Sequence, residues 1–109
     1  MQVIVDDFIC SLVGRTDFSC YQLCIHIYKH MGLKIPDIKK AKVQSLAYEE
    51  LVKYDLIFFD FTGKGRIDHV GLYLGNGQFI HCLDKAGVII SKLTHRYFSR
   101  RYMGRLIVV

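Results

Sequence analysis

The stretch HVGLYLGNGQFIH, which runs from His69 to His81, decides the fold. Apolar, β-branched and aromatic residues stand on both sides of Gly-Asn-Gly, which is the pattern of two antiparallel strands joined by a tight loop. The length of that loop decides where the two histidines point. A two-residue Asn-Gly loop would pair Leu72 with His81 and would send the imidazoles to opposite faces of the sheet.

A three-residue loop would have the opposite consequence. A type I turn followed by Gly77 in the left-handed conformation forms a bulge and pairs Leu74 with Gln78. Gly71 then lies opposite His81, and both imidazoles share a face as diagonal neighbours about 7 to 8 Å apart at the backbone. One ring could then orient the other, and Gly71 would leave space between them for a substrate or a helix terminus. Both registers stay open at this stage.

Further strands are expected on both sides of this hairpin. Residues 55–61, 88–91 and 105–109 are short, rich in β-branched or aromatic residues, and separated by turn residues. Together with the hairpin strands at 69–74 and 78–82, they predict an antiparallel sheet of five strands.

Two helices are expected before the strands. Apolar residues recur at helical spacing over 3–13 and again over 20–31, where Ser19 and Gln22 form a capping box. A weaker helical pattern covers 45–52. Because no strand–helix–strand alternation follows, the sequence predicts an α+β domain with its N-terminal helices packed on one face of the sheet.

The chain of 109 residues carries 15 Lys and Arg against 10 Asp and Glu, which gives a formal net charge of +5. Its 51% hydrophobic content supplies a core for one domain over residues 1–109 and excludes intrinsic disorder. No apolar run approaches the roughly 20 residues of a membrane span, so membrane insertion is not expected. The first residues lack the pattern of a secretory signal peptide. We therefore expect synthesis in the cytoplasm and, for any action outside it, delivery by another machine.

Basic side chains are concentrated at Lys39, Lys40, Lys92, Arg96, Arg100, Arg101 and Arg105. No nucleic-acid-binding motif accompanies them, which argues against a nucleic-acid partner. A polyanion such as a bacterial envelope rich in phosphate and carboxylate would be attracted by the charge alone.

Cys20 is the first candidate for chemistry because it stands in the first turn of a predicted helix. The positive end of the helix dipole stabilises a thiolate there, which favours a nucleophile. The alternative is a buried structural cysteine, the commoner fate of a cysteine on an apolar stripe. Cys24, one turn deeper on the same face, is expected to be such a core cysteine.

Cys20, His69 and His81 would form a nucleophile, a base and a residue that orients the base, if the second helix packs its N-terminus on the histidine face. A zinc site is the competing interpretation, with ligands from Cys20, Cys24, His81 and Cys82. Spacing opposes it, because adjacent His81 and Cys82 point to opposite sides of a strand. We therefore expect no zinc site. The four cysteines could pair as two disulfides, but the missing signal peptide and the adequate core favour reduced thiols.

Several motifs resemble the NlpC/P60 family of cysteine peptidases, and particularly its phage-tail-associated branch. They are SCYQLC at 19–24, GLKIPD at 32–37, YDLIFF at 54–59, HVGLYLGNGQFIH at 69–81, GVIISKL at 87–93 and YFSRRYMGR at 97–105. The resemblance implies a papain-like α+β fold, with the nucleophile at a helix N-terminus against an antiparallel sheet.

By this resemblance Cys20 is the nucleophile, His69 the general base and His81 the residue that orients it. Family members typically hydrolyse the amide between γ-D-glutamyl and a diamino acid in peptidoglycan stem peptides, without metal or cofactor. Stem peptides are thus the implied substrate, and a phage tail or the delivery machine of a toxin the implied partner. Phe8 stands where many members place a tyrosine that assists the oxyanion. The alternatives are an impaired module that binds wall peptides or a tail partner, and an amidase or acyltransferase on another substrate.

Overall fold

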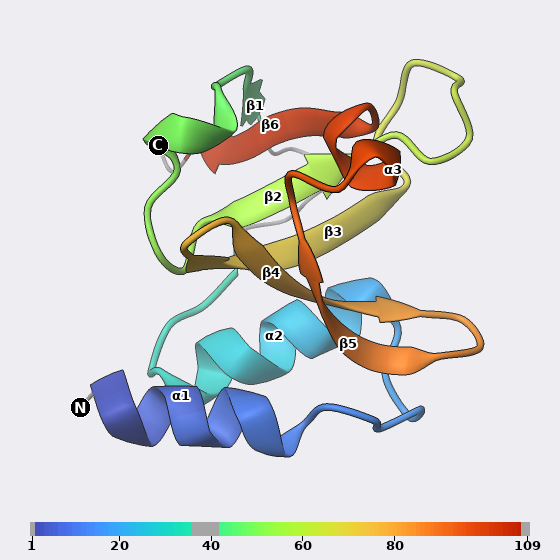
Figure 1. The fold of residues 1–109 in the computed structure, drawn as a ribbon. Coiled ribbons are helices and arrows are strands. Elements are labelled where there is room, and N and C mark those ends of the chain that lie inside the picture. Colours follow the sequence, from blue (N-terminus) through green and yellow to red (C-terminus); the bar gives the residue numbers. More distant parts are fainter. Residues whose placement is uncertain (1, 36–41, 108–109) are drawn as a thin grey trace.

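Two N-terminal helices lie together on one face of an antiparallel sheet (Figure 1). The computed structural model describes residues 2–35 and 42–107, and the two helices are α1 (Gln2–Ser11) and α2 (Cys20–His30). This arrangement confirms the predicted α+β class. Among the helices of the described part, none is long and apolar enough to cross a membrane.

The start of α2 is fixed by the predicted capping box. Ser19 Oγ accepts a hydrogen bond from the Gln22 N–H at 3.2 Å, and Gln22 Oε1 accepts one from the Ser19 N–H at 3.1 Å. At the other end Gly32 adopts φ 77°, the left-handed conformation expected just beyond a helix. The cap places Cys20 at the first helical position, where backbone N–H groups have no partner within the helix.

The sheet has six strands in the order β1-β6-β2-β3-β4-β5, with every neighbouring pair antiparallel. The strands are β1 (Lys42–Gln44), β2 (Leu56–Phe59), β3 (His69–Gly75), β4 (Gln78–Leu83), β5 (Gly87–Lys92) and β6 (Tyr102–Ile107). Five correspond to the predicted strands. The sixth, β1, is not predicted, because its three residues are too few to show an alternation. The helix expected over 45–52 is only a single 3-10 turn, η2 (Tyr48–Glu50).

Strand β6 begins at Tyr102, earlier than the predicted segment 105–109, whose last two residues lie outside the described part. Gly104 within it has φ 144°, and a Cβ there would overlap the carbonyl oxygen of Gln44 in β1. The close approach of the two backbones therefore requires a glycine. Lys39, Lys40 and the end of the GLKIPD motif also lie outside the described residues.

The loop between β3 and β4 is the two-residue Asn-Gly loop, but the pairing of Leu72 with His81 expected from it is wrong. Asn76 and Gly77 form a two-residue turn with positive φ at both positions, as in type I′, and Gly75 pairs with Gln78. On the β3 side of this turn, a bulge between Tyr73 and Gly75 shifts the register by one residue.

The bulge determines the register of the rest of the hairpin. Leu72 pairs with Ile80, so Gly71 and His81 lie at opposing positions, as the three-residue loop predicts. The predicted pairing of Leu74 with Gln78 is wrong, because the extra residue sits inside β3 and not in the turn. The two histidines nevertheless share one face of the sheet.

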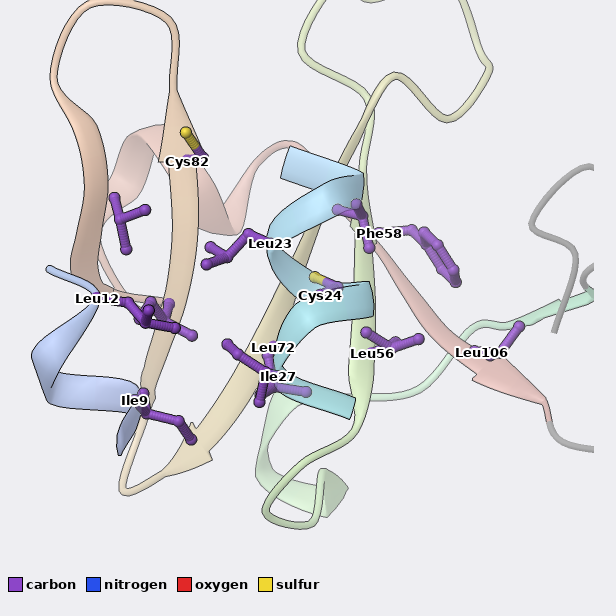
Figure 2. Packing of buried hydrophobic residues seen from close by; sticks show 13 residues of the cluster. Ile9, Leu12, Leu23, Cys24, Ile27, Leu56, Phe58, Leu72, Cys82 and Leu106 are labelled. Atoms are coloured by element: carbon purple, nitrogen blue, oxygen red, sulfur yellow. The ribbon is translucent and has the colours of Figure 1, made fainter. Parts of the chain in front are cut away.

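Buried side chains on the two faces form two separate clusters. The helix-side cluster lies between the sheet and the helices (Figure 2) and consists of Ile9, Leu12, Leu23, Cys24, Ile27, Leu56, Phe58, Val70, Leu72, Ile80, Cys82, Val88 and Leu106. The aromatic-side cluster on the other face consists of Leu51, Ile57, Phe59, Tyr73, Phe79 and Leu93. Phe98 of the short helix α3 (Arg96–Ser99) packs on it. Because side chains alternate along β3 and β4, His69 and His81 belong to this second face.

Candidate active site

A cleft of about 250 Å³ opens where β3 begins and β4 ends. It is lined by the start of α2, the loop before β3 and the end of β4, with Phe18, Ser19, Cys20, Phe61, Asp68, His69, Cys82, Leu83 and Asp84. Cys20 is partly exposed in it, and His69 is 6% exposed. The predicted nucleophile, Cys20, and the predicted base, His69, therefore line the same cleft.

The condition stated from the sequence was that the second helix packs its N-terminus on the histidine face. It is not met, because α2 packs on the opposite face, with Cys20 at its start against the helix-side cluster. Leu23 and Ile27 of α2 pack in the helix-side cluster, whereas His69 projects from the opposite face. Cys20 reaches the cleft because it is the first residue of α2 and because the cleft lies at the end of the strands. The position of the helix along the sheet thus brings the two side chains together.

The two imidazoles are hydrogen-bonded to each other. His69 Nε2 lies 2.8 Å from His81 Nδ1, with the rings nearly perpendicular at 81°. The second nitrogen of His81, Nε2, lies 2.8 Å from Ser91 Oγ in β5. His81 is fully buried, at 0% exposure. Both nitrogens of His81 are therefore partnered, and Nδ1 of His69 is the nitrogen left for the cleft.

Aromatic rings enclose the histidine pair. Phe61 stacks on His69 with ring centroids 4.2 Å apart and 20° between the planes. The ring centroids of Phe79 and His81 are 4.3 Å apart. Phe98 contacts the same imidazole edge-on, with ring centroids 5.2 Å apart. Burial lowers the pKa of His69 to about 4, against the opposing effect of nearby carboxylates. Burial and the neighbouring His69 lower the pKa of His81 to about 3, so both rings are neutral near pH 7.

A short loop holds Phe61 in place over His69. The Asp68 carboxylate accepts hydrogen bonds from the backbone N–H groups of Phe61 at 2.7 Å and Thr62 at 2.9 Å. Asp60 accepts further bonds from N–H groups along the same loop. The two carboxylates therefore fix the loop that carries Phe61.

Gly71 does not leave open space between the histidines, contrary to expectation. A Cβ at this position would stand 2.9 Å from Phe79 Cδ2 and 3.3 Å from His81 Cβ. The ring of Phe79 already fills the space, so the glycine permits close packing and no substrate enters there.

The remaining cysteines show no metal site. Cys24 is buried in the helix-side cluster, as predicted, and burial raises the pKa of its thiol. Cys82 donates to the carbonyl oxygen of Phe18 at 2.9 Å and projects from the face of β4 opposite His81, so the four candidate zinc ligands do not converge. Within residues 2–35 and 42–107 no group of three or more His, Cys, Asp or Glu could hold a metal ion. All four cysteines are free thiols.

Phe8, the residue at the expected tyrosine position, lies between the two helices. Its ring stacks on His30 with centroids 3.6 Å apart and 4° between the planes, and it lies 5.4 Å from His26. The cleft wall is built from other residues. Phe8 therefore contributes to helix packing and presents no group to the cleft.

Comparison with known proteins identifies the domain. Residues 12–107 match the NlpC/P60 family. The chain belongs to that family. The matched range includes all three candidate residues, Cys20, His69 and His81.

Individual relatives agree with this assignment. The murein DD-endopeptidase MepH of Escherichia coli (strain K12) is 35% identical over 97 residues, which are 83% of this chain and 36% of MepH. The murein DD-endopeptidase MepS/murein LD-carboxypeptidase of the same strain is 41% identical over 77 residues, 68% of this chain and 40% of that protein. The chain thus spans two fifths or less of these relatives. A solved NlpC/P60 family protein from Bacillus cereus ATCC 10987 has a TM-score of 0.76 at 27% identity, over 93% of this chain and 38% of that one.

Three residues around the site in this NlpC/P60 domain are not identified by sequence reasoning. The hydrogen bond between the Phe61 N–H and Asp68 forms only because the loop folds back on itself, and the spacing of the two residues does not predict it. Ser91 has a usable signal. In a hairpin that pairs Leu83 with Gly87, Ser91 falls on the same face as His81 and diagonal to it.

Proposed function

We propose that this NlpC/P60 domain is a cysteine endopeptidase that hydrolyses an amide bond of the γ-D-glutamyl–diamino acid type in peptidoglycan stem peptides. One observation carries the proposal: Cys20 and His69 line the same cleft, and His69 is held at 2.8 Å by the buried His81. The relatives named murein endopeptidases support the substrate class.

In the first half-reaction His69 Nδ1 takes the proton from the Cys20 thiol. The thiolate attacks the carbonyl carbon of the scissile amide and forms a tetrahedral intermediate. His69 then gives its proton to the leaving nitrogen, the C–N bond breaks, and the departing amine leaves an acyl thioester on Cys20.

In the second half-reaction a water molecule replaces the amine. His69 takes a proton from the water as the oxygen attacks the thioester carbonyl. The C–S bond then breaks, the thiolate of Cys20 recovers the proton, and the carboxylic acid product is released. The neutral state of His69 near pH 7 suits both proton transfers.

Stabilisation of the oxyanion is expected from the start of α2. The backbone N–H of Cys20 belongs to the first turn, whose donors point out of the helix. Since Phe8 presents no hydroxyl to the cleft, a phenol does not assist from that position.

We place this activity at the bacterial cell wall, with the protein delivered there by a phage tail or a secretion machine. The motif resemblance to the phage-tail-associated branch supports the first route, and the basic charge of +5 suits an anionic envelope.

A second candidate function is a module that binds wall peptides, or a tail partner, without cleaving them. The position of Phe8 favours it, because the hydroxyl that many family members supply is replaced by a ring packed against His30. An amidase or acyltransferase that uses the same thiol on another substrate is the third.

The test is mass spectrometry of defined muropeptides incubated with the protein, with Cys20→Ala and with Cys10→Ala. Cys10 is an exposed thiol on α1 and serves as the matched control. We expect products of γ-D-glutamyl cleavage from the protein and from Cys10→Ala, and none from Cys20→Ala. Absence of products from all three would favour the binding module or another acyl substrate.

A further inference from the structure

We propose that Ser91 is a positioning residue that holds His81 in one tautomer and thereby directs the proton-free Nδ1 of His69 toward Cys20. The inference rests on the proposed function, because it assigns His69 the role of base. It concerns a chain of three polar groups that begins at the cleft and crosses from β3 through β4 to β5.

The sheet register places Ser91 where it can reach His81. In the β4–β5 ladder Ser91 pairs with Phe79, and His81 pairs with Ile89. Ser91 is therefore a diagonal neighbour of His81 on the same face, and its Oγ lies 2.8 Å from His81 Nε2. Ser91 is only partly buried, whereas His81 has no exposed surface.

The protons along this chain can be counted from the base outward. A neutral His69 that accepts the thiol proton at Nδ1 carries its own proton on Nε2. That Nε2–H donates to His81 Nδ1, which must then be unprotonated. The single proton of neutral His81 therefore sits on Nε2 and donates to Ser91 Oγ.

The opposite order of donors is incompatible with the reaction. If Ser91 donated to His81, then His81 Nδ1–H would donate to His69 Nε2, and the proton of His69 would sit on Nδ1. His69 could not then accept the thiol proton at that nitrogen. Once His69 became an imidazolium, two N–H groups would also face each other across 2.8 Å.

A hydroxyl oxygen at Ser91 favours the productive order because it accepts from a buried donor. Without it, the Nε2–H of the fully buried His81 would have no partner, and moving the proton to Nδ1 would relieve that cost. The reversed chain described above would follow. Because Ser91 is partly exposed, its own O–H can donate a hydrogen bond to solvent while its oxygen accepts from His81.

The test compares Ser91→Val with Ser91→Thr. The two side chains have nearly the same shape and both suit a strand, but only Thr retains a hydroxyl. We expect Ser91→Val to lower kcat on a stem peptide by roughly ten- to hundredfold with little change in KM, and Ser91→Thr to stay near the unmodified protein. Equal kcat for the Val and Thr variants would overturn the proposal.

A second measurement needs neither a variant nor a substrate. Long-range 1H–15N NMR spectra of the full chain near pH 7 report which ring nitrogen of each histidine is protonated. We expect His69 and His81 both protonated on Nε2. A proton on His81 Nδ1 would overturn the inference, whether or not the protein cleaves stem peptides. Correct tautomers in a protein that cleaves nothing would instead count against the proposed function alone.

Discussion

The two faces of the sheet bury different kinds of side chain. The helix-side cluster is made of aliphatic side chains, one phenylalanine and two cysteine thiols, whose burial needs few specific partners. The aromatic side buries two imidazoles among phenylalanine rings, and their nitrogens must be paired. Within the described residues every buried side-chain nitrogen and oxygen has a hydrogen-bond partner.

Because of this difference, one face of the sheet supplies mainly apolar packing, and the other carries the proposed catalytic histidines. The helices hold the sheet by apolar packing on one side, and that packing also fixes the position of α2 along the sheet. The proposed catalytic groups belong to the other side and to the end of the strands. Substitution of a proposed catalytic residue should therefore change activity, whereas substitution of a residue that only packs should change stability.

The largest effect is expected on the aromatic side, from His69→Gln. Loss of the general base should lower kcat/KM on a stem peptide by about 10³-fold, equivalent to about 4 kcal/mol in the activation barrier. Steady-state kinetics measures this, with exposed His95→Gln as the control. If His69→Gln and His95→Gln cleaved the peptide equally fast, His69 would not be the base.

On the helix side, Ile27→Ala should act on stability. Ile27 is fully buried, so the cavity should lower the free energy of unfolding by about 2–5 kcal/mol. Ile25, two residues away and 39% exposed, is the matched control, and Ile25→Ala should change stability by less than about 0.5 kcal/mol. Urea denaturation measures both. Similar losses at the two positions would contradict the assignment of α2's buried face.

Gly71→Ala should affect the aromatic side through overpacking. The new methyl group would press on Phe79 and His81, at a cost of about 1–3 kcal/mol in the free energy of unfolding. Because the nearest atom belongs to the Phe79 ring, the double variant Gly71→Ala/Phe79→Leu should be more stable than the sum of the single changes predicts. Strict additivity in thermal or urea unfolding would argue against this contact.

A further effect is a pH dependence of stability. The pKa values of His69 and His81 are lowered in the folded state, so below pH 6.5 the unfolded chain binds more protons. Their stabilising contribution is present above pH 6.5 and is lost as the pH falls toward 4 and 3. Urea denaturation across this range should show a shallower decline for His81→Asn than for the exposed-site control His95→Asn. Parallel curves would show that His81 does not titrate with unfolding.

Much of the fold follows from local signals in the sequence. The capping box at Ser19 and Gln22 predicts the start of α2, and the alternation around Asn76-Gly77 predicts the central hairpin. That alternation leaves two registers open, so only the bulge decides that the two histidines share a face. The position of the bulge inside β3 is not predictable in the same way, because a turn and a bulge can absorb one extra residue equally well.

The site is less predictable because tertiary packing assembles it. The sequence offers Cys20, His69 and His81 as chemical types, but not the sheet end where α2 and β3 meet. Phe61 stacks on His69 because Asp68 accepts a hydrogen bond from the backbone N–H of Phe61 and holds the loop in place. No periodic pattern in the sequence predicts this contact. Strand β1 has too few residues to be predicted from its own sequence, and only its pairing with β6 defines it as a strand.

The most direct test of the central claim, that this cleft makes Cys20 a nucleophile served by His69, is site-resolved alkylation. Iodoacetamide is applied at about pH 7, and the modification of each cysteine is followed by mass spectrometry. We predict that Cys20 reacts faster than Cys10, which is the more exposed thiol, and that His69→Gln removes this advantage. Equal rates at the two cysteines, or an unchanged Cys20 rate in His69→Gln, would contradict the account.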